Sequence, residues 1–171
     1  IDELEYNQSV SEIEIAAPRE NIENLDELTV CTIDFRKVEK GYSVTKAIEF
    51  PDGMDIENLS EVNDITVEFP LEEFTTRVIT ISRDDITVIN SPSEYDIIPV
   101  TTGWDVTFIG TEEELEELSV QDILVQLDVS SVASSITGND YFRAAISISV
   151  PDKEFVWAVG SHTVAFQATE K

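Results

Sequence analysis

Hydrophobic and polar residues alternate over most of this chain, which is the period-two pattern of β-strands with one buried face. The alternation predicts strands at residues 13–15, 31–35, 44–50, 64–69, 77–82, 85–89, 104–108, 123–129, 144–150, 155–159 and 162–168. Turn-forming residues gather between them, at 51–53, 91–93, 137–140 and 159–161. Ile, Val and Thr number 52 and Ala, Leu and Met number 19, a balance that favours strands. The pattern therefore predicts a mainly β fold.

Two short helices are expected among the strands. At 111–118, Thr111 is placed to cap the helix, Glu114 to complete a capping box, and Leu115 and Leu118 to share one face. A second helix is expected at 18–25. It begins with Pro18, and proline is tolerated in the first turn of a helix. The predicted fold class is therefore mainly β with short helices, which gives it a minor α+β character.

The second half of the chain repeats the order of motifs in the first half. The matching blocks are 12–18 with 105–111, 31–38 with 125–132, 48–52 with 148–152 and 66–69 with 163–166. The spacings between blocks differ by a few residues, as repeats do when insertions fall in loops. We predict two small β-rich modules in tandem, residues 1–71 and residues 72–171, joined at a turn marked by Pro70.

The first module is predicted to lack its leading strand, because two strand patterns precede the second repeat at 77–90 and only residues 1–10 precede the first. The open sheet edge should then be covered by the segment 4–8, by the neighbouring repeat or by another molecule. The chain begins at Ile1 without an initiator Met, which suggests a processed or excised fragment.

The charge of the chain excludes two classes of partner. With 36 acidic and 10 basic residues among 171, the formal net charge is −26, which would repel both nucleic acid and an anionic bilayer surface. Ile, Val, Leu and Phe nevertheless supply 54 residues, enough for the chain to fold. No run of 18 apolar residues is present, so no membrane span is predicted and any membrane contact would need an upstream anchor.

Catalytic chemistry finds little support in the sequence. The lone histidine, His162, follows Ser161, and neighbouring strand residues point to opposite faces, so the two form no dyad. No phosphate-binding loop or nucleophile elbow occurs, and a carboxylate-pair hydrolase is a third alternative without specific support. Cys31 lies in an alternating pattern and is predicted to be a small buried residue. We predict no enzyme, no catalytic or metal-binding residues and no cofactor.

Calcium binding is the more serious alternative, since carboxylates cluster at 51–57, 83–85 and 137–140. The spacing of Asp52, Asp55 and Glu57 does not match the twelve-residue EF-hand loop, which favours solvated turns. A calcium-dependent cell-surface or adhesion module remains the alternative function.

Several other conspicuous residues receive structural interpretations. Asp34 and Asp128 recur in the repeat and are expected at equivalent positions, facing outward or accepting hydrogen bonds from a neighbouring turn, with flanking apolar residues buried. The acidic run 112–117 is interpreted as a solvated helix face. Trp104 and Trp157 fall in strand patterns and are predicted to lie in the core.

The common order of these motifs resembles two tandem YbbR-like domains, a family found in membrane-anchored regulators of the diadenylate cyclase, chiefly in Gram-positive bacteria. The resemblance rests on the first alternating strand, the acidic helix, the strand signatures 33–35 and 127–129, the strands that lead into Pro51 and Pro151, and the final Thr-Val-x-Phe strand. The family's usual Gly-Pro after the first strand is split here, as Ala17-Pro18 and Gly110-Thr111.

The resemblance implies a function as well as a fold. It implies a non-catalytic extracytoplasmic interaction module at the cell surface, tethered by an upstream anchor, that modulates cyclic di-AMP synthesis. Its partner would be a protein, either the diadenylate cyclase complex or a component of the cell envelope.

Overall fold

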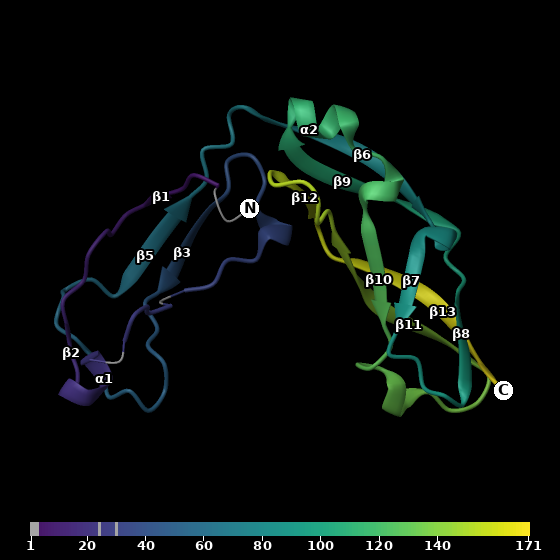
Figure 1. Ribbon diagram of the computed structural model, residues 1–171, viewed down its shortest axis with the longest axis horizontal. Helices are drawn as coiled ribbons and strands as arrows, with labels where there is room; N and C mark the ends of the chain where they lie inside the picture. The colour runs from purple at the N-terminus through teal and green to yellow at the C-terminus, as the bar shows by residue number, and fades with distance from the viewer. Residues whose placement is uncertain (1–3, 24, 30) are drawn as a thin grey trace. The chain divides into compact units, whose positions relative to one another are not determined.

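The computed structural model describes residues 4–23, 25–29 and 31–171, and the prediction of a mainly β fold is confirmed (Figure 1). The described chain forms two compact units. The N-terminal unit comprises Leu4–Asp34 and Val38–Glu72, and the C-terminal unit comprises Glu73–Lys171 together with the short segment Phe35–Lys37. The division falls one residue after the boundary predicted from the sequence, and the assignment of each unit to one repeat stays a prediction.

The C-terminal unit contains two sheets. The larger has the strand order β7-β10-β11-β13-β8 and is antiparallel except between β7 and β10. Its strands are β7 (Ile86–Ile89), β8 (Tyr95–Pro99), β10 (Leu124–Asp128), β11 (Asp140–Ser149) and β13 (His162–Glu170). The smaller sheet is antiparallel, has the order β12-β9-β6, and consists of β6 (Phe74–Ser82), β9 (Gly103–Thr111) and β12 (Val156–Val159).

The core of this unit follows from the alternation in its strands. Val125 and Leu127 on β10 and Phe166 on β13 are almost fully buried, and Phe108 on β9 packs into the same cluster from the other sheet. Residues between these positions point outward, because successive side chains of a strand face opposite sides. The predicted burial of Leu127 and Val129 is confirmed.

Helix α2 (Glu112–Glu117) lies where the sequence predicted a helix. Thr111 accepts a hydrogen bond from the Glu114 amide at 3.4 Å, and Leu115 and Leu118 are buried. The residue before the cap is Gly110, where a Cβ atom would stand 2.8 Å from Val156 Cγ2, so no side chain fits there. Short 3₁₀ segments complete the unit: η1 (Phe35–Lys37), η2 (Arg83–Asp85), η3 (Val120–Asp122) and η4 (Ala133–Ser135).

The N-terminal unit has shorter elements. Its sheets have the orders β1-β5-β3 and β2-β4, and its elements are β1 (Asn7–Gln8), β2 (Ile15–Ala16), α1 (Arg19–Glu23), β3 (Ser43–Ala47), β4 (Glu57–Asn58) and β5 (Asp64–Glu68). Strand β1 pairs with one edge of β5, and Ser9 extends this pairing by donating its amide to Thr66 O at 2.9 Å. The N-terminal segment therefore covers one edge of β5, and the missing leading strand of the first module stays a prediction.

The strand predicted at 31–35 is wrong. Residues 31–34 have no regular structure, and Phe35 begins the 3₁₀ segment η1. Cys31, Ile33 and Phe35 are half-buried instead of buried, and Asp34 does not occupy the strand-end position of Asp128. The physical reason is tertiary: the Phe35 ring packs edge-on against Trp157, with the ring centroids 5.5 Å apart, and η1 lies beside β12.

Smaller differences concern lengths. The strand predicted at 13–15 is the two-residue β2, and the helix predicted at 18–25 is the five-residue α1, whose first turn is closed by the Pro18 carbonyl. Strands β1, β4 and β8 were not predicted, and β11 begins inside the predicted turn 137–140. These elements lie at sheet edges or turns, where local periodicity is weak.

Candidate interaction surface

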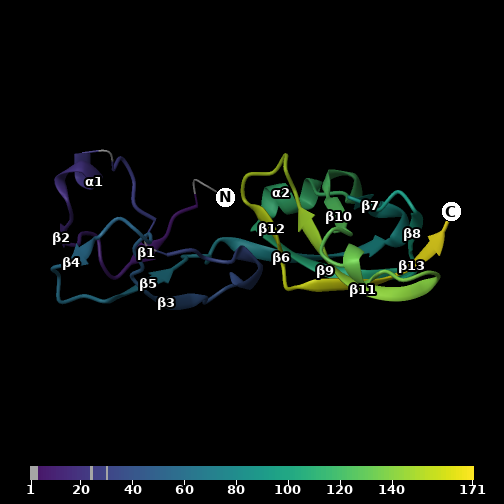
Figure 2. The same cartoon turned by 90° about the horizontal axis from the view of Figure 1, so that it is seen from below.

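The side of the larger sheet that faces away from the core is a broad exposed surface in the C-terminal unit. We call it the outer face, and define it by the outward positions of the three central strands, whose order β10-β11-β13 can be followed in Figures 1 and 2. These positions are Leu124, Gln126, Asp128, Tyr141, Arg143, Ala145, Ser147, Ser149, Thr163, Ala165, Gln167 and Thr169.

The composition of the outer face contrasts with that of the chain. The whole chain carries a net charge of −26, whereas Asp128 and Arg143 are the charged side chains of these twelve positions and balance each other. On the edge strand β8, Asp96 lies on the same side as Ile98 and pairs with Lys171 at 3.6 Å. The remaining positions are small, hydroxylated, amide or apolar. Depletion of charge is a property of the central part of protein interfaces.

One row across the outer face exposes large apolar side chains. Tyr141 on β11 lies opposite Gln167 on β13, which lies opposite Ile98 on the edge strand β8. Tyr141 is 65% exposed and Ile98 is 53% exposed. An aromatic ring with an exposed apolar neighbour and an amide between them is a typical anchor for a protein partner.

A groove of about 560 Å³ opens at the other end of the same strands. Its wall includes Gln126 and Ser147, which lie opposite each other on β10 and β11, and Ile89 on β7. Arg36 of η1 and His162 at the start of β13 also line it. The groove thus combines hydrogen-bonding side chains with an apolar wall.

Asp128 has a defined structural role at the rim of this groove. Its carboxylate accepts hydrogen bonds from the Ser130 side chain, from the Ser130 amide at 2.9 Å, and from Asn90 Nδ2 at 3.1 Å. These bonds lower the pKa of the Asp128 carboxyl below its usual value, because they favour the ionised form. The prediction that Asp128 accepts hydrogen bonds from a neighbouring turn is confirmed.

His162 is engaged by the backbone. Its Nε2 atom lies 3.1 Å from the carbonyl oxygen of Val159, and its ring is half-buried. Ser161 precedes the strand in the turn and is exposed. His162 therefore lines the groove, and its Nε2 atom is engaged with the backbone of the preceding turn.

The acidic segments considered for calcium are used in backbone hydrogen bonds. Asp85 accepts the Ser82 amide at 2.7 Å, Asp140 accepts the Tyr141 amide at 2.7 Å, and Asn139 accepts the Glu170 amide at 3.1 Å. Within residues 4–23, 25–29 and 31–171, no group of three or more His, Cys, Asp or Glu side chains is placed to hold a metal ion. The helices in this part of the chain are too short and polar to span a membrane.

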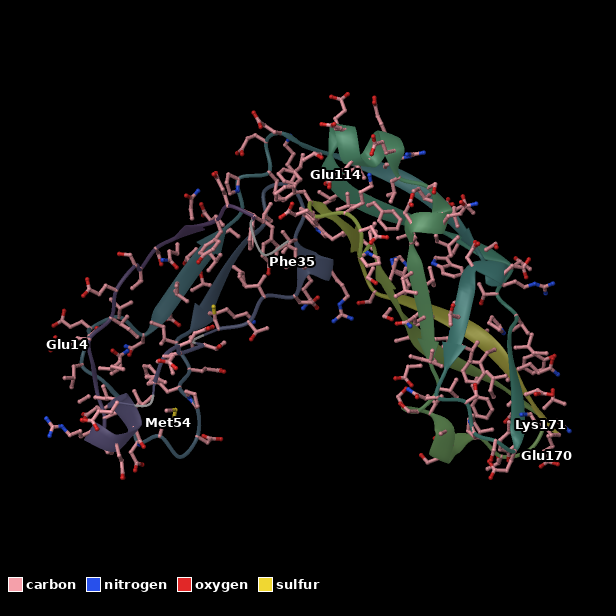
Figure 3. All side chains as sticks on the ribbon, viewed as in Figure 1. Glu14, Phe35, Met54, Glu114, Glu170 and Lys171 are labelled. Carbon is pink, nitrogen blue, oxygen red and sulfur yellow. The ribbon has the colours of Figure 1, made fainter. Side chains whose placement is uncertain are left out.

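The acidic face of α2 differs from the prediction at one residue. Figure 3 labels Glu114, which is half-buried and accepts the amides of Glu154 and Phe155, both at 3.1 Å. On the neighbouring turn of the helix, Glu117 pairs with Lys153 at 2.9 Å, and this hydrogen bond raises the pKa of the lysine. Glu112, Glu113 and Glu116 are exposed, as predicted.

Both tryptophans lie at the core, as the sequence predicted. The sequence did not point to several residues of the outer face and the groove. Trp157 is buried and Trp104 packs against the core. Tyr141, Ile98 and Arg36 received no functional interpretation from the sequence. The alternation around Ala144 and Ile146 could have placed Tyr141 on the outward side of β11, whereas nothing local points to Arg36.

The chain matches a crystal structure of a YbbR-like protein from Streptococcus pneumoniae TIGR4, with a TM-score of 0.38 and 10% sequence identity. The match covers 75% of this chain and 63% of the other, so this chain spans less than two thirds of that protein. The chain matches no protein-family model and no curated protein.

That protein bears the name of the family that the sequence motifs of this chain resemble. The tandem arrangement stays a prediction. A likeness at this TM-score provides no residue-by-residue correspondence and carries no argument about function.

Proposed function

We propose that the chain is a non-catalytic interaction module and that the outer face of the C-terminal unit is its binding surface. The observation that carries this proposal is the low charge of the outer face, where Asp128 and Arg143 balance each other and Tyr141 and the neighbouring Ile98 are exposed, in a chain of net charge −26. A surface of this kind minimises the cost of removing charges from water when a partner binds.

The finer proposal follows the family resemblance. The module would act outside the cytoplasm, as part of a membrane-anchored regulator, and would modulate the synthesis of cyclic di-AMP by a diadenylate cyclase. Its partner would be the cyclase complex or a protein of the cell envelope, because the charge of the chain disfavours polyanions.

The test uses the protein as its cell makes it. A photo-crosslinking amino acid at Tyr141 should yield an adduct with a second protein, whereas the same amino acid at Glu113, an exposed residue of α2, should yield none. Tyr141→Ala should also change the cellular level of cyclic di-AMP. Equal crosslinking from the two positions would refute the assignment of the surface, and an unchanged nucleotide level would refute the regulatory role.

A calcium-dependent adhesion module would behave differently. Low millimolar calcium would raise the melting temperature of the purified chain, since a ligand that binds the native state stabilises it. We expect no such rise, because carboxylates in two of the three acidic segments already accept hydrogen bonds from backbone amides.

A further inference from the structure

Strands β2 and β4 lie side by side in the N-terminal unit and form a two-stranded sheet (Figure 2). Within the described part of the chain, no strand pairs with the other edge of β2, which we call the β2 edge. The strand that β2 matches in the predicted repeat is β9, which lies between β12 and β6 and is paired on both sides. The β2 edge is therefore open to a further strand.

The two units can be compared position by position, because their strands pair in the same order and register. The order β1-β5-β3 corresponds to β8-β13-β11, and β2 pairs with β4 as β9 pairs with β12. Matching residues face each other in both units, namely Ile15 and Asn58 like Phe108 and Ala158, and Thr45 and Thr66 like Ala145 and Thr163. The β2 edge therefore corresponds to the edge of β9 that β6 covers.

Apolar residues beside the β2 edge are incompletely buried. Ile13 is half-buried, and Ile22 on α1 is 46% exposed. The matching residues of the C-terminal unit, Val106 and Leu115, are almost fully buried, and β6 contributes the buried side chain of Ile79 opposite Val106. A strand of the same kind on the β2 edge would remove these apolar surfaces from water, which favours its binding.

Strand β6 also shows which charge the added strand should carry. The Arg77 guanidinium donates to the carbonyls of Leu115 and Leu118 at the end of α2. The end of α1 has the same turn, in which Leu25 donates its amide to the Ile22 carbonyl at 3.2 Å. Carbonyls at the end of a helix attract cationic donors, so an arginine in the corresponding position of an added strand would be stabilised.

The N-terminal unit uses its own basic residues elsewhere. They are Arg19, which pairs with Glu23 at 3.3 Å, Lys40, which donates to the Glu72 carbonyl at 3.4 Å, and Lys46, which lies on β3 in the other sheet. Its 17 acidic residues attract a basic segment. The charge of the unit thus complements an arginine supplied from outside it.

We propose that the β2 edge binds an extended segment of a partner protein, in which an arginine is followed by apolar residues at alternate positions. The segment pairs antiparallel with β2, as β6 does with β9. Its arginine lies opposite Ile15 and donates to the end of α1, and the apolar residue two positions later lies opposite Ile13. Backbone hydrogen bonds supply affinity in this mode of recognition, and the alternating side chains supply specificity.

The test uses the peptide of residues 74–82 as the probe, because it carries this pattern around Arg77. Hydrogen exchange of the purified chain is followed by mass spectrometry with and without the peptide. We expect the peptide to slow the exchange of amides in residues 12–17 and to leave residues 103–111 unchanged, since β6 already pairs with β9. A peptide with Arg77→Glu should lose this protection, because its carboxylate would face the carbonyls of α1.

A pair of chain variants tests the same site from the other side. Ile22→Glu places a charge where the segment packs and should abolish the protection by the peptide. Tyr6→Glu, at a 56% exposed apolar residue outside β2 and α1, is the matched control and should retain it. Circular dichroism checks that both variants are folded, and the Arg77→Glu peptide tests the contact in the unmodified chain.

Three results would overturn the proposal. Unchanged exchange of residues 12–17 at saturating peptide would refute the site. Protection of these residues in the protein as its cell makes it, without peptide, would show that the same polypeptide supplies the strand. Protection that grows with the concentration of the chain alone would assign the strand to a second copy. None of these results bears on the outer face, because crosslinking at Tyr141 reports on a different surface.

Discussion

The two units of the chain differ in how densely they are packed and in how much charge they carry. Among the described residues, the C-terminal unit buries twenty-one hydrophobic side chains, whereas the N-terminal unit buries six, namely Leu4, Val38, Ile65, Val67, Phe69 and Leu71. The N-terminal unit has 17 acidic and three basic residues in Leu4–Asp34 and Val38–Glu72. The C-terminal unit, which is larger, has 17 acidic and seven basic residues.

This comparison teaches that a similar order of motifs does not ensure a similar core. Burial of an apolar side chain contributes about 1.5–3 kcal/mol, so the unit that buries more of them has the larger hydrophobic contribution to its stability. Repulsion among carboxylates acts against the smaller unit in addition. We therefore expect the N-terminal unit to be the less stable half, and the predictions below test that expectation.

The largest expected effect is a difference in hydrogen exchange between the units. Amides of β5 should exchange through openings of much lower free energy than amides of β13, because local stability follows the density of buried contacts. Exchange measured by mass spectrometry or NMR resolves the two strands. Equal protection of the two strands would contradict the comparison.

Substitution of one phenylalanine in each unit should reveal the same asymmetry. Phe166→Ala removes a fully buried ring from the C-terminal core and should cost about 3–5 kcal/mol of unfolding free energy. Phe50→Ala, at a half-buried position of the N-terminal unit, should cost less than about 1.5 kcal/mol. Urea unfolding followed by circular dichroism measures both, and similar losses in the two variants would show that the N-terminal unit is better packed than described.

Arg77→Met should destabilise the C-terminal unit by about 1–3 kcal/mol, because carbonyls at the end of α2 lose a charged donor. Arg143→Met is the control, since the Arg143 guanidinium donates to the Thr163 hydroxyl, at 3.3 Å on the exposed outer face. The chemical denaturation midpoint of each variant gives the comparison. A control as destabilised as Arg77→Met would argue against a specific role for the α2 carbonyls.

Salt should stabilise the N-terminal unit more than the C-terminal unit. Screening weakens repulsion among exposed carboxylates, and the N-terminal unit has the larger excess of them for its size. Calorimetric melting at increasing sodium chloride should therefore raise the earlier transition by more than the later one. A melting profile independent of salt would contradict this.

The smallest effect concerns Asp128 and pH. Hydrogen bonds from Ser130 and Asn90 lower the pKa of its carboxyl in the folded state, so its contribution to stability is present above the unfolded-state pKa and is lost as the pH falls through the folded-state pKa. The difference in stability between the wild type and Asp128→Asn should consequently be larger near neutral pH than in acid. Denaturation of both proteins at several pH values checks this, and a difference that grows on acidification would reverse the sign of the argument.

The sequence alone determined the features that depend on neighbouring residues along the chain. Alternation predicted β10 and β13 with their buried positions Leu127 and Val164, and the spacing from Thr111 to Leu118 predicted α2. Turn residues predicted the bends at Gly53 and Gly160, whose positive φ angles of 83° and 91° suit glycine. These properties follow from backbone geometry over a few residues, which periodicity and capping patterns record directly.

The tertiary structure alone decided which distant residues meet. Phe35 packs with Trp157 instead of forming a strand, and Arg77 caps a helix that begins 35 residues later. The Glu114 carboxylate accepts the Thr111 hydroxyl of its own helix cap at 3.4 Å and also the amides of Glu154 and Phe155. Each of these contacts depends on the order of strands in the two sheets, and the alternation within a strand carries no information on which strand becomes its neighbour.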